Sequence, residues 1–227
     1  MSLIITIDGP AAAGKSSVAK ALAKQFHLPY LESGSLYRAM AWMVLQKGVD
    51  PNRQSDVETF CNNLHVVIHP GGKVFVDQED VTDHLRLPEV SRVSSVVSAY
   101  PKVREKLLSI QRNIAQNGAV VEGRDTGTVI FPEAQLKFFL DADLTVRGER
   151  RYHEMVEKGT LCDQKTVLDE MKDRDDKDSH RVLAPLCAAS DAVIIDSTNL
   201  SLDTVIDQII QRVAQYVGCT QNQTVKQ

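Results

Sequence analysis

One loop motif near the N-terminus constrains the fold of this 227-residue chain more strongly than any other feature. Residues 9–16 read GPAAAGKS and match the pattern G-x-x-x-x-G-K-[ST] at every fixed position. An apolar run over residues 3–8 precedes the motif, and a helical pattern follows it over residues 15–26. A strand, this loop and a helix in that order are typical of a phosphate-binding loop. We therefore predict a nucleoside triphosphate site at the first strand-to-helix connection.

The residue types of this loop account for the predicted chemistry. Its glycines allow backbone N–H groups to converge on phosphates, and the N-terminal end of the helix adds a positive dipole. Lys15 is expected to reach the β- and γ-phosphates of ATP, the Ser16 hydroxyl to ligate Mg²⁺, and Asp8 to hold a water of the metal shell. The residues predicted to bind the ATP phosphates are Gly9, Pro10, Ala11, Ala12, Ala13, Gly14, Lys15, Ser16 and Ser17.

Strands and helices alternate at both ends of the chain. Residues 119–122, 136–140 and 192–195 are apolar runs of strand length, and helical patterns separate the later ones. Ser201 is a candidate N-cap for the last helix, which has one wide apolar face. That face is formed by Leu202, Val205, Ile206, Ile209, Ile210 and Val213. The alternation predicts an α/β fold with a mostly parallel sheet covered by helices on both faces.

The middle of the chain departs from this alternation. Residues 64–68 and 74–77 are β-rich runs joined by Pro-Gly-Gly-Lys at 70–73, which predicts an antiparallel hairpin. Because a local antiparallel unit does not belong inside a parallel sheet, we interpret residues 64–82 as a small inserted module.

Two predicted helices follow the inserted module. They cover residues 88–100 and 101–116, and Pro101 occupies the first position of the second helix. At the end of the chain, the polar residues after Cys219 are expected to fray.

The charge balance excludes one broad class of partner. The chain has 26 Lys and Arg against 30 Asp and Glu, a formal net charge of −4, whereas a surface that grips nucleic acid needs a basic excess. A small anionic substrate in a local basic pocket is compatible with this balance.

No signal peptide fits the first ten residues, and no apolar stretch approaches the ~18–20 residues that span a bilayer. We expect a cytoplasmic monomer that binds neither nucleic acid nor membrane.

Four further segments carry a resemblance to a known family. They read ESGSLYR at residues 32–38, YPKVRE at 100–105, EGRDTGTV at 122–129 and DRDDKDSHR at 173–181. In this order behind the phosphate-binding loop, they resemble the bacterial-type cytidylate kinases over residues 3–213, the β-rich insertion included. The Gly-Arg-Asp and Arg-Asp-Asp-x-Asp-x-x-Arg segments are far more specific than the loop, which many families share.

The resemblance implies a single P-loop kinase domain that comprises a core, an acceptor-binding region, a lid and a polar tail. Residues 33–118 bind the acceptor nucleotide and include the small antiparallel β insertion; we call them the acceptor segment. Residues 146–181 form a helical lid, called here the lid segment, and residues 218–227 are a polar tail. The core comprises residues 1–32, 119–145 and 182–217.

The implied activity is the phosphorylation of CMP or dCMP by ATP with Mg²⁺, which gives CDP or dCDP and ADP. By the same resemblance, the residues that approach the acceptor phosphate are Ser33, Tyr37, Arg38 and Arg124. Those that read the cytosine are Ser95, Arg104 and Asp125. Asp178 meets the sugar, and Arg174 and Arg181 bridge towards the phosphates.

The chemistry of cytosine agrees with two of these roles. A carboxylate such as Asp125 can accept a hydrogen bond from the exocyclic amino group, and a guanidinium such as Arg104 can donate to the ring nitrogen and carbonyl. Uracil places a carbonyl oxygen where cytosine has its amino group, so buried polar groups would stay unpaired. A mismatch of this kind supports strong discrimination between the two bases.

A basic helical pattern lies within the lid segment. Arg147 and Arg151 share one face of the predicted helix, and the resemblance implies that they close over the donor phosphates. A solvated basic helix supported by Glu149 and Glu154 is the alternative. The predicted catalytic residues are Lys15, Arg124, Arg174, Arg181, Arg147 and Arg151.

Two residues depart from the family pattern. Glu32 stands where the family usually has Asp, and Ser16 follows Lys15 where many members have Gly, which predicts a more direct contact of Ser16 with the metal.

Two other functions stay open. One is a different P-loop metabolite kinase, acting on shikimate, dephospho-coenzyme A or another nucleoside monophosphate. The other is a regulatory protein that binds ATP or CMP without turnover.

Overall fold

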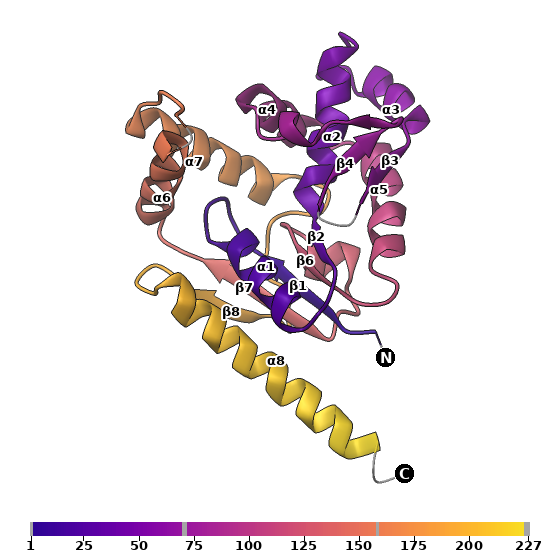
Figure 1. Cartoon of the computed structure of the whole chain (residues 1–227). Helices are drawn as coiled ribbons and strands as arrows, with labels where there is room; N and C mark the ends of the chain where they lie inside the picture. The colour runs from indigo at the N-terminus through magenta and orange to yellow at the C-terminus, as the bar shows by residue number, and fades with distance from the viewer. Residues whose placement is uncertain (1, 70–71, 158, 225–227) are drawn as a thin grey trace.

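A five-stranded parallel sheet forms the centre of the structure, a computed structural model that describes residues 2–69, 72–157 and 159–224 (Figure 1). Its strands are β1 (Ile4–Asp8), β2 (Tyr30–Glu32), β6 (Ala119–Glu122), β7 (Leu136–Asp141) and β8 (Val193–Asp196). They lie in the order β2-β6-β1-β7-β8, and every neighbouring pair is parallel. The predicted α/β fold with a mostly parallel sheet is confirmed.

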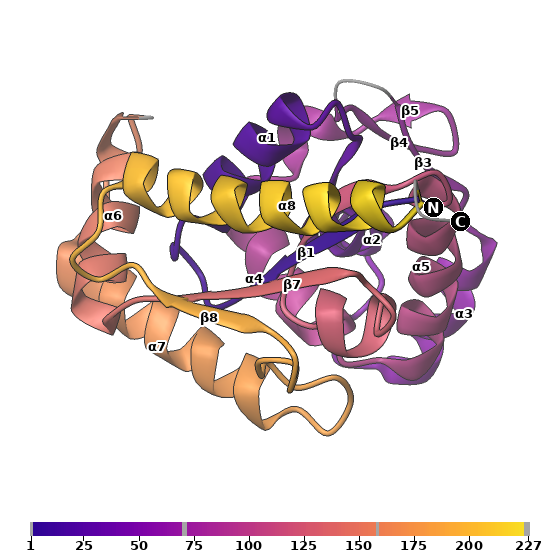
Figure 2. The ribbon, with the colours of Figure 1, turned by 90° about the horizontal axis from the view of Figure 1, so that it is seen from below.

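Two helices cover one face of this sheet. α1 (Lys15–Gln25) follows the loop after β1, and α8 (Leu202–Thr224) runs beside it across the same face (Figure 2). Val18, Leu22 and Ile209 from these helices are fully buried in one cluster with residues of β1 and β7. The apolar face predicted for the last helix therefore packs against the sheet, except for Leu202 at its start, which is exposed.

The last helix begins where the sequence predicts and ends later. The Ser201 hydroxyl accepts a hydrogen bond from the Thr204 N–H at 3.1 Å and caps the helix. α8 then continues to Thr224, through most of the segment that is expected to fray, because no proline interrupts it and Val217 still packs against the core. Residues 225–227 of that tail lie outside the described residues. Neither α8 nor any other helix in the described ranges is long and apolar enough to cross a membrane.

The acceptor segment packs on the opposite face of the sheet. Alternate residues of a strand point to opposite sides, so Val120 of β6 joins the α1–α8 cluster while Ala119 and Val121 join the cluster of the acceptor segment. The helices of this segment are α2 (Ser33–Gln46), α3 (Gln54–Asn63), α4 (Pro88–Val97) and α5 (Pro101–Ile114). The prolines that begin α4 and α5 confirm the predicted helix starts.

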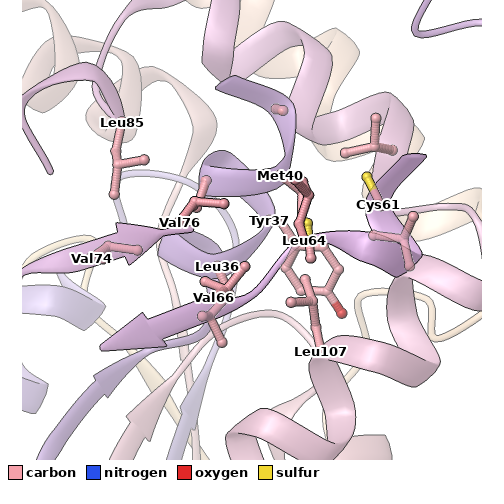
Figure 3. Packing of buried hydrophobic residues seen from close by; sticks show 14 of the residues in the cluster. Leu36, Tyr37, Met40, Cys61, Leu64, Val66, Val74, Val76, Leu85 and Leu107 are labelled. Carbon is pink, nitrogen blue, oxygen red and sulfur yellow. The ribbon is translucent and has the colours of Figure 1, made fainter. Parts of the chain in front are cut away.

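The predicted hairpin is present and has one more strand than expected. β3 (Val66–Ile68) and β4 (Val74–Val76) pair antiparallel, and β5 (Glu79–Asp80) pairs with the other edge of β4. Figure 3 shows Val66 and Val76 beside Leu36 of α2. Val74 and Met40 belong to the same buried cluster, so the module is attached by a shared apolar core. Residues 70–71 of the predicted turn lie outside the described residues.

A stacked pair of rings joins α2 to the end of this module. The short 3₁₀ turn η1 (Thr82–His84) follows β5, and the His84 ring lies 4.1 Å from the Trp42 ring with an interplanar angle of 5°. The Leu85 side chain next to it is buried in the same cluster (Figure 3). The module therefore contacts α2 both through its strands and through the η1 turn that follows its last strand.

Two helices of the lid segment stand away from the sheet (Figure 1). They are α6 (Leu144–Glu157) and α7 (Gln164–His180), and the Asp163 side chain caps α7 by accepting from the Thr166 N–H at 2.9 Å. A Cβ atom at Gly148 would lie 2.7 Å from a methyl carbon of Leu168, so glycine allows the two helices to approach closely.

The turn after β1 depends on a glycine. Gly9 has φ +144°, and a Cβ atom at this position would overlap the carbonyl oxygen of Leu140 in β7. Gly14 has φ +94° with open space around it, so alanine there adds only backbone strain of about 1–2 kcal/mol.

We expect Gly9→Ala to lower the free energy of unfolding by about 3 kcal/mol or more, because strain and overlap add, and by more than Gly14→Ala does. Urea denaturation of both variants tests this, and equal losses would contradict it.

Candidate active site

The predicted phosphate-binding loop connects β1 to α1 and encloses its lysine. The Lys15 side chain is buried, and its ammonium donates a hydrogen bond to the carbonyl of Pro10 at 2.6 Å. Burial lowers the pKa of Lys15 to about 7, and the positive charge of Arg124 contributes in the same direction. The ammonium therefore lies in a site that disfavours its charge until an anion arrives. Ser17, which the sequence analysis also assigned to the ATP phosphates, is exposed on α1.

Ser16 lies next to a carboxylate at the end of a neighbouring strand. Its hydroxyl donates a 2.6 Å hydrogen bond to Glu122, the last residue of β6, and the Tyr30 hydroxyl reaches the same oxygen at 3.3 Å. A hydroxyl and a carboxylate are the oxygen ligands that Mg²⁺ prefers beside substrate phosphates. The donor set at the start of α1 thus fits Mg²⁺, and Glu122 is a member that the sequence analysis did not assign.

Asp8 is bound by hydrogen bonds to the turn that follows β6. Its two carboxylate oxygens accept hydrogen bonds from the Thr126 N–H and hydroxyl and from the Gly127 N–H, at 2.7–2.9 Å. These donors belong to η2 (Thr126–Ile130), a short π-helical turn after β6. Burial raises the pKa of Asp8 to about 6 in spite of these bonds. Asp8 therefore fixes the turn that follows Asp125, and the carboxylate in contact with Ser16 is Glu122.

Four cations of the predicted site influence one another. They are Lys15, Arg38, Arg124 and Arg174. Burial and the neighbouring Arg124 lower the pKa of Arg174 to about 10, and burial also lowers the pKa of Arg38. The Nε–H groups of Arg38 and Arg174 are buried without a hydrogen-bond partner among the described residues. Unpaired buried donors on mutually repelling cations indicate a binding site for an anion.

Buried carboxylates balance part of this charge. Asp178, on α7, accepts a hydrogen bond from Arg124 at 3.0 Å and lies 3.9 Å from both Arg174 and Arg181. Although burial opposes ionisation, these arginines hold the pKa of Asp178 below its usual range. The structure thus brings together Asp178 and the three arginines that the sequence analysis assigned to the sugar and phosphates.

Two of the predicted base-reading residues, Arg104 and Asp125, form a cluster with Arg181. Asp125 is buried between Arg104, with which it forms an ion pair, and Arg181, whose Nη2 lies 3.2 Å from Oδ1. Arg104 also donates to the Ser98 carbonyl at 3.0 Å and lies 5.5 Å from the centre of the Tyr37 ring. Tyr37 is therefore both a packed core residue and a platform for Arg104.

A cavity lies beside this cluster. It has a volume of about 310 Å³ and lies between α4 and α7. Its lining includes Ser95, Asp178 and Arg181, which the sequence analysis assigned to the base, the sugar and the phosphates, respectively. Ser33 is buried at the start of α2, where Gly123 permits a close approach: a Cβ at Gly123 would lie 3.3 Å from that of Ser33.

The two predicted lid arginines lie in different surroundings. Arg147 is buried and donates to the carbonyl of Ala11 in the phosphate loop at 3.2 Å and to Asp175 of α7 at 2.5 Å. Asp175 in turn accepts from the Ala11 N–H at 3.5 Å. Arg151 lies at the surface beside Glu154, with 2.9 Å between the charged atoms. The structure brings Arg147, but not Arg151, to the loop.

Together these features define a class of protein. A phosphate loop with a buried lysine, an adjoining cluster of buried arginines with two Nε–H donors left without a hydrogen bond, and a neighbouring cavity are the parts of a P-loop kinase that phosphorylates a small anionic acceptor.

The comparisons with known proteins assign the family. The family model described as cytidylate kinase matches residues 5–215. The cytidylate kinase of Oceanobacillus iheyensis is 40% identical over 218 residues, which cover 94% of this chain and 95% of that protein. The cytidylate kinase of Enterococcus faecalis is 42% identical over 218 residues, which cover 94% and 96%. The chain belongs to the cytidylate kinase family.

The low pKa of Lys15 predicts proton uptake on nucleotide binding. Triphosphate next to the ammonium favours the charged form, so a lysine that is mostly neutral at pH 8 should gain about one proton when the nucleotide binds. The affinity of the protein for the nucleoside triphosphate should therefore fall as the pH rises above about 7. Calorimetry of a non-hydrolysable ATP analogue with Mg²⁺, in buffers of different ionisation enthalpy, measures this uptake.

The control for this measurement is Lys15→Arg. Arginine stays charged at every accessible pH, so the variant should bind the analogue without proton uptake. The same buffer dependence in both proteins would contradict the assignment to Lys15.

Proposed function

We propose that this site transfers the γ-phosphoryl group of ATP to the phosphate of CMP or dCMP, giving CDP or dCDP and ADP. The observation that carries the proposal is the buried group of cations with unpaired Nε–H donors, which adjoins both the phosphate loop and the base-reading cluster. Arg124 and Asp125 are consecutive, so one turn after β6 supplies a ligand for the acceptor phosphate and a ligand for the base.

On the donor side, the loop amides and Lys15 hold the phosphates of ATP. Lys15 exchanges its hydrogen bond with the Pro10 carbonyl for one with a phosphate oxygen. Ser16 and Glu122 would hold Mg²⁺, which neutralises phosphate charge and fixes the geometry of the transferring group. Arg147 approaches from the lid, where its contact with Ala11 already places it beside the loop.

On the acceptor side, Ser33, Arg38 and Arg124 hold the phosphate of the nucleoside monophosphate. Tyr37 supports Arg104, which reads the base together with Asp125 and Ser95. Asp178 accepts from the sugar hydroxyl, and Arg174 and Arg181 bridge towards the phosphates.

This reaction needs no dedicated general base. The acceptor is a phosphate oxygen, and the second pKa of a phosphate monoester is about 6, so the oxygen is already ionised near neutral pH. Two anions must instead be held together in line, which is a task of positioning and charge stabilisation. The arrangement of cations on both sides of the transfer path performs that task.

A coupled assay of ADP release tests the function. ADP release should require an added acceptor and should be fastest with CMP or dCMP among CMP, dCMP, UMP, AMP and shikimate. Tight ATP binding without acceptor-dependent release would instead favour a regulatory protein, and fastest release with another acceptor would favour a different metabolite kinase.

Replacing Asp125 should alter base selectivity. Asp125→Ala removes the acceptor for the cytosine amino group, so we expect kcat/KM to fall by about 10²-fold or more with CMP and much less with UMP. Melting temperatures of this variant and of Asp125→Asn, which keeps the side-chain shape, distinguish lost recognition from lost folding. Equal losses on CMP and UMP in folded protein would rule out base reading.

The two lid arginines should differ in their contribution to the rate. Arg147→Ala removes a cation beside the loop, and we expect kcat to fall by about 10²-fold or more. Arg151→Ala should change kcat by less than about threefold, because its partner is the surface residue Glu154. Steady-state kinetics of both variants check this, and the reverse order would show that Arg151 reaches the phosphates instead.

A further inference from the structure

The carbonyl group of Asp125 is the first acceptor of the π-helical turn η2. It accepts backbone hydrogen bonds from the N–H groups of Val129 at 2.9 Å and Ile130 at 3.2 Å. Turns of this kind are rare and occur frequently at functional sites. The closure of the turn therefore sets the position of the Asp125 backbone, from which the carboxylate reaches Arg104.

A side chain of α5 holds the end of this turn. Arg112 donates from Nε to the carbonyl of Ile130 at 3.0 Å and from Nη2 to the carbonyl of Val129 at 3.4 Å. The last carbonyls of a helical turn have no partner within the turn itself. In the part of the chain that the structure describes, Arg112 is the hydrogen-bond donor to both of these carbonyls.

The same two residues connect Arg112 to Asp125. Val129 and Ile130 accept from Arg112 through their carbonyls and donate to Asp125 through their N–H groups. The Ile130 side chain is buried in the core of the acceptor segment, which anchors the end of the turn further. At the start of the turn, the N–H of the residue after Asp125 is bound by Asp8. The Asp125 backbone is thus fixed between β1 and α5.

Helix α5 also contacts Asp125 directly. Arg104, on the same helix, forms an ion pair with the Asp125 carboxylate. Arg104 and Arg112 are separated by about 12 Å along the helix axis. Leu107 and Gln111, which lie between them, are fully buried, so the helix is a well-packed support. One helix therefore fixes both the side chain and the backbone of Asp125.

We propose that Arg112 is a positioning residue for base recognition, which holds the end of η2 so that Asp125 stays where it meets the base. Arg112 is exposed and its hydrogen bonds go to backbone carbonyls, so we assign it an action through the turn. The proposal rests on the proposed function, since it takes Asp125 as the acceptor for the cytosine amino group.

Base selectivity is the first test. Arg112→Ala should lower the ratio of kcat/KM for CMP to kcat/KM for UMP by about tenfold or more, because a shift of Asp125 by about 1 Å weakens its bond with cytosine. Arg112→Lys keeps a cationic donor for one carbonyl and should recover part of this ratio. Lys106→Ala is the matched control and should leave the ratio unchanged, since Lys106 of α5 donates to the carbonyl of Asn62 in α3.

Hydrogen exchange tests the turn without any substrate. The N–H groups of Val129 and Ile130 should exchange about tenfold faster or more in Arg112→Ala than in the wild-type protein, and at the wild-type rate in Lys106→Ala. Mass spectrometry of a peptide that contains η2 measures this difference. Should Arg112→Ala unfold at the assay temperature, selectivity and exchange are measured on Arg112→Lys, with smaller changes in the same direction.

The Asp125→Ala variant separates this proposal from the proposed function. In the Asp125→Ala background, Arg112→Ala should cause no further loss of selectivity, because the group that it positions is gone. A further loss there would overturn the proposal, as would unchanged selectivity or unchanged exchange in folded Arg112→Ala protein. If Asp125→Ala itself keeps the selectivity of the wild-type protein, base reading by Asp125 in the proposed function is refuted instead.

Discussion

The fold has to hold several like charges close together in a place from which water is largely excluded. The pKa of Lys15 lies near 7 and that of Arg174 near 10, because burial and a neighbouring cation both act against the charged forms. Each cation therefore needs a carboxylate within reach, and those carboxylates come from the ends of parallel strands and from the lid. They are Glu32 at the end of β2, Glu122 at the end of β6, Asp125 in the following turn, and Asp175 and Asp178 on α7. Charge compensation thus explains why the sheet edge and the lid segment meet where they do.

The same compensation prepares the site for its substrates. Every arginine of the base-reading cluster is already oriented by protein partners, so the guanidiniums need little rearrangement when a nucleotide arrives. The donors that are left without partners are those at the cations near the phosphate loop. The groups that we propose to read the base thus have partners within the protein. The Nε–H donors of Arg38 and Arg174, which we propose to lie near the phosphates, have no hydrogen-bond partner among the described residues.

The sequence predicts the sheet and the phosphate loop because their patterns are local, and it identifies the segments that supply the candidate site residues. It does not predict α2, since ten of its fourteen residues are buried and the amphipathic periodicity of a surface helix is missing. It does not reveal that Asp8 also accepts hydrogen bonds from a turn 118 residues away, because those bonds depend on how β6 lies beside β1. It also pairs Arg147 with Arg151, because spacing identifies a helix face but not which residue of that face meets the next element. Glu122 and Asp175 stand within segments that the sequence analysis noted, yet their partners depend on how the segments meet.

The stacked rings of Trp42 and His84 give the molecule a built-in optical label. Trp42 is the single tryptophan of the chain, so the intrinsic indole fluorescence reports on α2 and the exit of the β module and on no other part of the molecule. α2 also presents Arg38, one of the residues assigned to the acceptor phosphate. Emission from this one residue therefore separates events in the acceptor segment from events in the lid, without any dye or engineered chromophore.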